Sequence, residues 1–188
     1  MTHTNAPRRR AAELALGILV IALALLAGAR DLGIGLQNWD SYAPVKLSDP
    51  APPFEVQLSD GSPLSAESLT GQVSLLTFWA TWCHACGLEM PTITAIDRHY
   101  AGTDLHVYGI NRDSGDPRQR KAAVEAYMAK REMEFLQVYD DGQMAQAFGV
   151  EAIPYMVIVD RRGDVRHLHM GQVSERTLRK QIDALLEE

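Results

Sequence analysis

An apolar stretch that leads into a pair of cysteines limits the fold of this chain more than any other feature of its sequence. Residues 73–79 read Val-Ser-Leu-Leu-Thr-Phe-Trp and carry apolar side chains at both odd and even positions. Successive side chains of a strand point to opposite faces, so this pattern predicts a central strand that is covered on both faces. Cys83 and Cys86 follow directly, where a helical pattern begins. The chain is therefore expected to be an α/β protein with two thiols at the end of a buried strand.

The segments around this strand alternate between strand and helix patterns. The other expected strands are 54–58, 105–110, 135–138, 156–159 and 165–170. The expected helices follow Cys83, Asp116 and Ser174, and a short one covers 144–148. Pro91 predicts a kink one turn into the first helix. This order predicts a three-layer domain with helices on the sheet.

The charge of the chain is divided unevenly between its N-terminus and the rest. The 188 residues have a net charge of −6, but residues 1–30 contain four arginines and one glutamate. The remaining residues therefore carry 14 basic and 23 acidic side chains, a net charge of −9. A body this acidic lacks the basic surface that nucleic-acid binding requires, so no nucleic acid is expected as a partner.

Residues 14–29 are all apolar or glycine and follow an arginine cluster at 8–10. This run is a little shorter than the ~20 residues that span a hydrocarbon core, but residues from Ala11 onward extend it. Arginines before such a run keep the N-terminus in the cytoplasm. The preferred interpretation is a retained single span in the cytoplasmic membrane, with the domain facing the periplasm. The alternative is cleavage after Ala29, where the small residues suit signal peptidase, and secretion to the periplasm.

The sequence thus divides into three parts. Residues 1–30 form the signal or membrane anchor. Residues 31–53 form a linker rich in proline and glycine, a composition that favours extended chain. Residues 54–188 form the folded domain.

The position of the cysteine pair gives the two thiols different tasks. A helix N-terminus offers free amide donors and partial positive charge, which favour a thiolate. Cysteines in such motifs have pKa values of about 3.5 to 7.5, against about 8.5 for a free cysteine. Only the thiolate attacks a disulfide, so Cys83 is the expected nucleophile. Cys86 lies about one turn further along and can attack the mixed disulfide that forms at Cys83.

Other uses of the pair are weaker. A closed zinc site needs four ligands, and the sequence has no second pair of cysteines. A structural disulfide across so short a loop constrains little chain entropy. A peroxidase-type thiol would need proline and threonine where Leu76 and Ala80 stand. His167 and His169 share one strand face but are interpreted as surface residues.

A series of motifs in fixed order resembles the TlpA/ResA-like family of extracytoplasmic thioredoxins, a broad group that includes the cytochrome c maturation reductases. The resemblance covers roughly residues 50–187 and rests on five segments, at 51–54, 69–71, 78–86, 89–91 and 149–154. It implies a thioredoxin fold, a central mixed sheet flanked by helices, with an N-terminal strand extension and an inserted helix–strand element near 116–138. It also implies thiol–disulfide exchange with protein partners, a transmembrane thiol donor and no cofactor or metal.

The resemblance also assigns roles to single residues. Cys83 matches the attacking cysteine and Cys86 the resolving one, so the pair forms the redox-active disulfide. Pro154 matches the cis-proline whose loop, with Ile153, binds the substrate backbone. Glu89 resembles an acidic residue that moves protons, although a glutamate that complements the helix dipole is an alternative.

The residues next to the cysteines are harder to assign. Trp79 and Trp82 are expected to pack in the core, although Trp82 adjoins the nucleophile and is also a candidate substrate contact. Thr77 stands where cytoplasmic thioredoxin has a buried aspartate. His84 is a second candidate contact and departs from the proline-containing dipeptides of the family. A protonated His84 would stabilise the Cys83 thiolate and make the pair more oxidising.

The sequence therefore predicts a membrane-anchored, extracytoplasmic oxidoreductase that reduces protein disulfides. The alternative within enzymes is an oxidase that donates its disulfide. Non-enzymatic alternatives are a copper-delivering binding module and a holdase.

Overall fold

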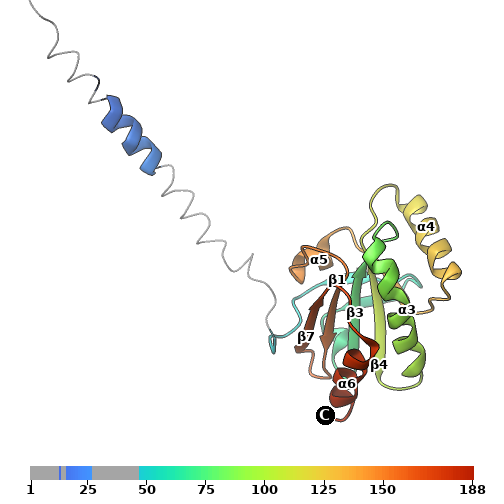
Figure 1. Cartoon of the computed structure of the whole chain (residues 1–188). Helices are drawn as coiled ribbons and strands as arrows, with labels where there is room; N and C mark the ends of the chain where they lie inside the picture. The colour runs from blue at the N-terminus through green and yellow to red at the C-terminus, as the bar shows by residue number, and fades with distance from the viewer. Residues whose placement is uncertain (1–12, 14–15, 27–46) are drawn as a thin grey trace, which may run out of the picture. The chain divides into compact units, whose positions relative to one another are not determined.

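The computed structural model describes residue 13, residues 16–26 and residues 47–188 (Figure 1). The chain divides into two units, Met1–Ala43 and Pro44–Glu188. Residues 16–26 of the first unit are helical with exposed side chains. Within the described residues no helix combines the length and the apolar character needed to cross a membrane. Part of the predicted anchor, the cleavage site at Ala29 and most of the linker lie outside the described residues.

The second unit is built on a five-stranded mixed sheet with the strand order β5-β4-β3-β6-β7 (Figure 1). β3 (Val73–Trp79) is parallel to β4 (Leu105–Asn111) and antiparallel to β6 (Tyr155–Val159). The edge strands are β5 (Leu136–Tyr139), parallel to β4, and β7 (Val165–Met170), antiparallel to β6. Every residue of β3 is buried, which confirms the prediction of a central strand covered on both faces.

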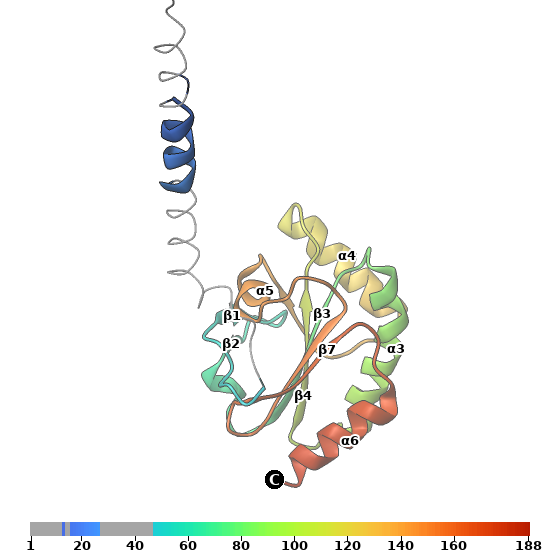
Figure 2. The same cartoon turned by 60° about the vertical axis from the view of Figure 1, so that its left-hand side comes forward.

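Helices cover both faces of this sheet (Figure 2). One core joins the sheet to α3 (His84–His99), α4 (Pro117–Lys130) and α6 (Glu175–Leu186), and it includes Leu75 and Trp79 of β3. The other core joins the opposite face to η1 (Glu67–Leu69) and α5 (Gln143–Ala147), and it includes Leu76 and Phe78. The alternation of β3 side chains between the two cores confirms the three-layer arrangement.

The helix starts follow the capping residues found in the sequence. The Asp116 carboxylate accepts from the backbone N–H groups of Arg118 and Gln119, at 3.0 and 3.1 Å. The Ser174 hydroxyl accepts from the N–H of Thr177 at 3.2 Å. Pro91 lies inside α3, which continues beyond it to His99. The side chains of Asp116 and Ser174 thus satisfy amide groups that have no partner within the helix.

The N-terminal extension is a separate hairpin rather than the single strand expected at 54–58. β1 (Glu55–Gln57) pairs antiparallel with β2 (Pro63–Ser65), which the sequence patterns did not predict. Leu58 then bridges to Val138 of β5. β2 has only three residues and begins with proline, so it lacks the alternating run that identifies a strand. The inserted helix–strand element predicted near 116–138 is present as α4 and β5.

Gly109 of β4 provides a test of the packing beneath the cysteine end of the sheet. A Cβ at this position would overlap the side-chain amide of Gln137. That buried amide accepts from Trp79 Nε1 at 2.9 Å and donates to the Phe135 carbonyl oxygen at 3.1 Å. We therefore expect Gly109→Ala to lower the free energy of unfolding by about 1–3 kcal/mol, measured by urea denaturation.

The double variant Gly109→Ala/Gln137→Ala is the control for this prediction. Removal of the overlapping amide should make its destabilisation smaller than the sum of the two single variants. Strictly additive effects would contradict the proposed overlap.

Candidate functional site

The two cysteines lie where β3 gives way to α3. Cys83 is the N-cap residue of α3, and its Sγ accepts from the backbone N–H of Cys86 at 3.1 Å. The two residues form a disulfide with their Cα atoms 5.2 Å apart. The Cys83 side chain retains 8% of its accessible surface, whereas Cys86 is fully buried. A protein partner can therefore reach Cys83 but not Cys86.

The loop before β6 lies against this disulfide. The Ile153–Pro154 peptide bond is cis, as the resemblance implies for this position. The carbonyl oxygen of Ile153 is 3.9 Å from Cys83 Sγ. The Pro154 carbonyl oxygen accepts from the N–H of Gly171, which ties the loop to the end of β7. The fold thus brings the carbonyl group of Ile153, distant in sequence, to Cys83 Sγ.

Glu89 is a buried carboxyl on the same helix as the cysteines. It lies three residues after Cys86, so the two side chains share one face of α3. Glu89 is only 2% exposed, and its carboxylate oxygens accept from the N–H of Val173 at 3.2 and 3.3 Å. Burial raises the pKa of Glu89, and the hydrogen bond from Val173 offsets part of that rise.

This environment speaks against the helix-dipole alternative for Glu89. The first turn of α3 contains no acidic residue, because Glu89 lies beyond it. A carboxylate stabilised by the helix N-terminus would have a lowered pKa, opposite to the shift at Glu89. Thr77, by contrast, is buried on the β3 face that carries Leu75 and Trp79, and its hydroxyl has no hydrogen-bond partner among the residues that the structure describes. Glu89 is therefore the better candidate for proton transfer.

The two tryptophans have different environments. Trp79 is fully buried, which confirms that it packs in the core. Trp82 is 70% exposed, so the expectation that it packs in the core is wrong. Trp82 is the third residue after the end of β3, where the chain has already left the sheet. Trp82 and the exposed His84 therefore lie on the surface that surrounds Cys83.

A hollow of about 330 Å³ opens beside Cys83, between the start of α3 and the far end of α4. It is lined by Thr81, Trp82, Cys83, His84, Gly87, Leu88, Tyr127 and Arg131. The sequence patterns do not identify Tyr127 or Arg131 as site residues. Their position depends on how α4 packs against α3, which local patterns do not encode.

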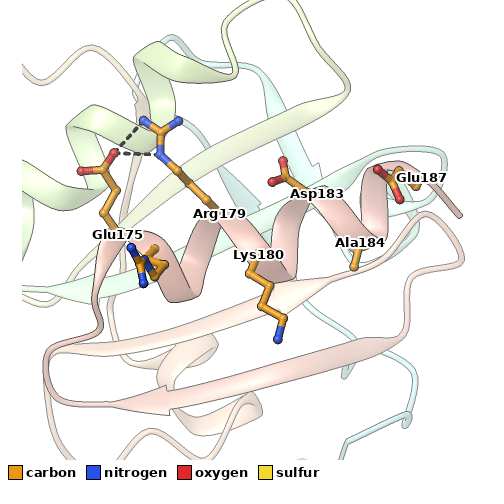
Figure 3. Close-up of a pocket in the computed structure, with 7 residues that line it drawn as sticks. Glu175, Arg179, Lys180, Asp183, Ala184 and Glu187 are labelled. Carbon is orange, nitrogen blue, oxygen red and sulfur yellow. Dashed lines mark hydrogen bonds and ion pairs between the residues drawn. The ribbon is translucent and has the colours of Figure 1, made fainter.

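A larger hollow of about 780 Å³ runs along α6 but has no comparable chemistry (Figure 3). All the residues that line it lie on α6, apart from Glu187, which is the C-cap residue of this helix. Arg179 and Glu175 form an ion pair there, with Nη2 2.6 Å from Oε1. None of the site residues predicted from the sequence lies in this hollow. The disulfide end of β3 is therefore the candidate active site.

A thioredoxin-like fold with a disulfide at the N-terminus of the helix that follows its central strand defines an oxidoreductase of the thioredoxin class. The chain belongs to the AhpC/TSA family, whose model matches residues 47–168. This membership and the names of the relatives confirm the resemblance seen in the sequence motifs.

The relatives are named for thiol chemistry. The chain is 25% identical to the thioredoxin-like protein YneN of Bacillus subtilis, over 89% of this chain and 95% of the relative. It is 25% identical to the thiol-disulfide oxidoreductase ResA of Bacillus thuringiensis, over 85% of this chain and 90% of the relative. A solved structure of a thiol:disulfide interchange protein of the thioredoxin family from Chlorobium tepidum superposes with a TM-score of 0.64 at 25% identity. That match covers 77% of this chain and 99% of the other.

Proposed function

We propose that this protein is a membrane-anchored, extracytoplasmic oxidoreductase that reduces disulfides in other proteins. Cys83 is the nucleophile and Cys86 the resolving thiol. The observation that carries this proposal is the unequal exposure of two bonded sulfurs at the start of α3. A thiol that is accessible at a helix N-terminus can attack a partner, and a buried one three residues later can only attack its neighbour.

The exchange moves one electron pair from the protein to its partner. In the reduced protein, the Cys83 thiolate attacks one sulfur of the partner's disulfide, which forms a mixed disulfide and releases the partner's other sulfur as a thiolate. The Cys86 thiolate then attacks Cys83 Sγ and releases the second partner sulfur. Both released thiolates take up protons, the partner ends as a dithiol and the protein as the Cys83–Cys86 disulfide.

The surroundings of the sulfurs suit these two steps. The N–H of Cys86 points at Cys83 Sγ, and the N-terminus of α3 adds positive potential, so both favour the Cys83 thiolate. Cys86 is fully buried, and burial disfavours its ionisation. A base is therefore needed for the second step. Glu89 takes that proton, because burial raises the pKa of its carboxyl toward the pKa of a thiol.

Exposed apolar side chains around the disulfide support a protein as the substrate. Trp82, Leu88 and Met170 are 70%, 59% and 74% exposed. Trp82 and Leu88 border the hollow beside Cys83, and Met170 pairs with Tyr155, the residue after Pro154. Clustered exposed apolar groups mark protein interaction sites. A partner docked there would meet Cys83 and the backbone of Ile153 and Pro154.

The location of the protein follows from its N-terminal sequence. Residues 1–30 anchor the chain in the cytoplasmic membrane, residues 31–53 act as a tether, and the domain from residue 54 faces the periplasm. The Arg8–Arg10 cluster and the apolar run at 14–29 support this orientation. Electrons reach the disulfide from a transmembrane thiol donor, and the resemblance favours a task in cytochrome c biogenesis.

Equilibration of the protein with glutathione tests the direction of electron flow. We expect a reduction potential well below about −220 mV, which corresponds to a reductant. A value near −120 mV would support the disulfide-donating oxidase instead. His84→Ala is the informative variant, because removal of a side chain that stabilises the thiolate should make the potential more negative.

A further inference from the structure

Helix α4 places a cationic side chain beside the exchanging sulfur. Tyr127 and Arg131, at the end of α4, line the same hollow of about 330 Å³ as Cys83. The Tyr127 ring packs on Trp79, with the ring centroids 5.1 Å apart. The Arg131 guanidinium lies over the Tyr127 ring, with its Cζ 3.6 Å from the ring centroid. These two contacts, Trp79 with Tyr127 and Tyr127 with Arg131, hold the positive charge of Arg131 at the rim of the site.

The charge of α4 contrasts with that of the rest of the domain. Residues 31–188 have a net charge of −9, yet the only acidic residue of α4 is Glu125. Two of the basic side chains of α4 are engaged elsewhere, since Arg120 donates to backbone carbonyls and Lys121 pairs with Glu125. Arg131 is exposed and forms no ion pair with any described residue. Its charge is therefore available to a partner.

The walls of the hollow complete a site for one side chain of a partner. Trp82 and Leu88 supply exposed apolar surface. Gly87 leaves room between α3 and Tyr127, because a Cβ at this position would lie 3.1 Å from the Tyr127 hydroxyl. The hollow adjoins Cys83 itself. A side chain that enters it must therefore belong to a residue close in sequence or space to the cysteine under attack.

We propose that this hollow selects partner proteins with an acidic side chain beside their reactive cystine, and that Arg131 is the residue that selects it. The inference rests on the proposed function, because it specifies which disulfides the Cys83 thiolate attacks. The carboxylate of the partner pairs with the Arg131 guanidinium, and the methylene groups of the same side chain contact Trp82 and Leu88. Among the described residues that line the hollow, Arg131 is the one Lys or Arg side chain, and its positive charge favours such a partner by charge complementarity.

Two model peptides test this selection. Both contain one intramolecular disulfide and differ only in glutamate or glutamine next to the attacked cysteine. The second-order rate of the reduced full-length protein is measured with each at low salt. We expect the glutamate peptide to react about threefold faster, the size of an exposed ion pair, and the difference to shrink at high salt. Arg131→Gln should bring the ratio to about one, and Arg131→Glu should invert it.

Lys180→Glu is the matched control, because it changes the net charge as Arg131→Glu does. Lys180 is exposed on α6, and the neighbouring carbonyl oxygen of Arg179 accepts from the hydroxyl of Tyr100, at the opposite end of α3 from Cys83. This variant should keep the wild-type preference. An equal change in Lys180→Glu would show that net charge alone acts, and it would overturn the selection by Arg131.

Hydroxyethyl disulfide, a small neutral substrate, distinguishes a failure of the selection by Arg131 from a failure of the proposed function. If the wild-type protein reduces it but treats the two peptides alike, the selection is wrong while the proposed function stands. If the reduced wild-type protein reacts with neither hydroxyethyl disulfide nor the peptides, the proposed function itself fails and the selection fails with it.

Discussion

Cys83→Ala is expected to abolish the reduction of protein disulfides, so that insulin reduction in the presence of a thiol donor falls to the rate of the donor alone. Cys83 keeps 8% of its residue surface accessible whereas Cys86 keeps none, and the chain has no other cysteine. The buried Cys86 cannot replace it, because a residue with no accessible surface is out of reach of a partner's disulfide.

Cys86→Ala should fail in a different way. Its Cys83 thiolate still attacks, but no thiol resolves the product, so a covalent complex with the partner accumulates on a non-reducing gel. Wild-type turnover in both variants would contradict the assignment of roles. The same Cys86→Ala variant, expressed in the native envelope, identifies the partner by what it captures.

Glu89→Gln is expected to slow turnover by roughly 10²-fold, because it removes the base that takes the proton of Cys86. The substitution keeps the shape of the side chain and an oxygen that can accept from Val173, so the fold should persist. The expected defect lies in resolution. Mixed disulfide should therefore accumulate in Glu89→Gln, while the first attack by Cys83 proceeds at its wild-type rate in stopped-flow measurements.

The pH dependence of stability gives a second readout for Glu89. Burial raises its pKa in the folded protein above the usual 4.5, so the neutral form favours folding. That contribution is complete below pH 4.5 and is lost as the pH rises through the folded pKa. Relative to wild type, Glu89→Gln should therefore become more stable as the pH rises from acid to neutral.

An exposed glutamate provides the control. Glu187 is exposed and follows the last residue of α6, so Glu187→Gln should leave the turnover unchanged. A Glu89→Gln variant that matches it in turnover would show that Glu89 is only a packing residue.

Much of the fold is readable from the sequence because its strongest elements are local. β3 is identified by seven apolar or small residues in a row, and α6 by Ser174 and three buried positions in helical spacing. β2 was not predicted, since a three-residue strand that starts at Pro63 has no pattern of its own. It exists because β1 supplies its partner.

The site shows the same division between local and distant information. The proposed order of attack by Cys83 and Cys86 can be inferred from the sequence, because it rests on their positions at the start of a helix. The exposure of Trp82, the burial of Glu89 under Val173 and the position of Arg131 beside Cys83 depend on how helices pack across the sheet. A large apolar side chain such as Trp82 is expected in a core, and only the structure shows that it lies on the surface.

The proposed function depends on the exchange of an electron pair between the two sulfurs and a disulfide of another protein. It is tested most directly by mixing the fully reduced protein with an oxidised protein substrate, quenching with acid, alkylating free thiols and weighing both proteins by mass spectrometry. We expect the loss of both alkylation sites on Cys83 and Cys86 to match, mole for mole, the gain of two on the substrate. Full alkylation of both cysteines beside an unchanged, still oxidised substrate would contradict the account.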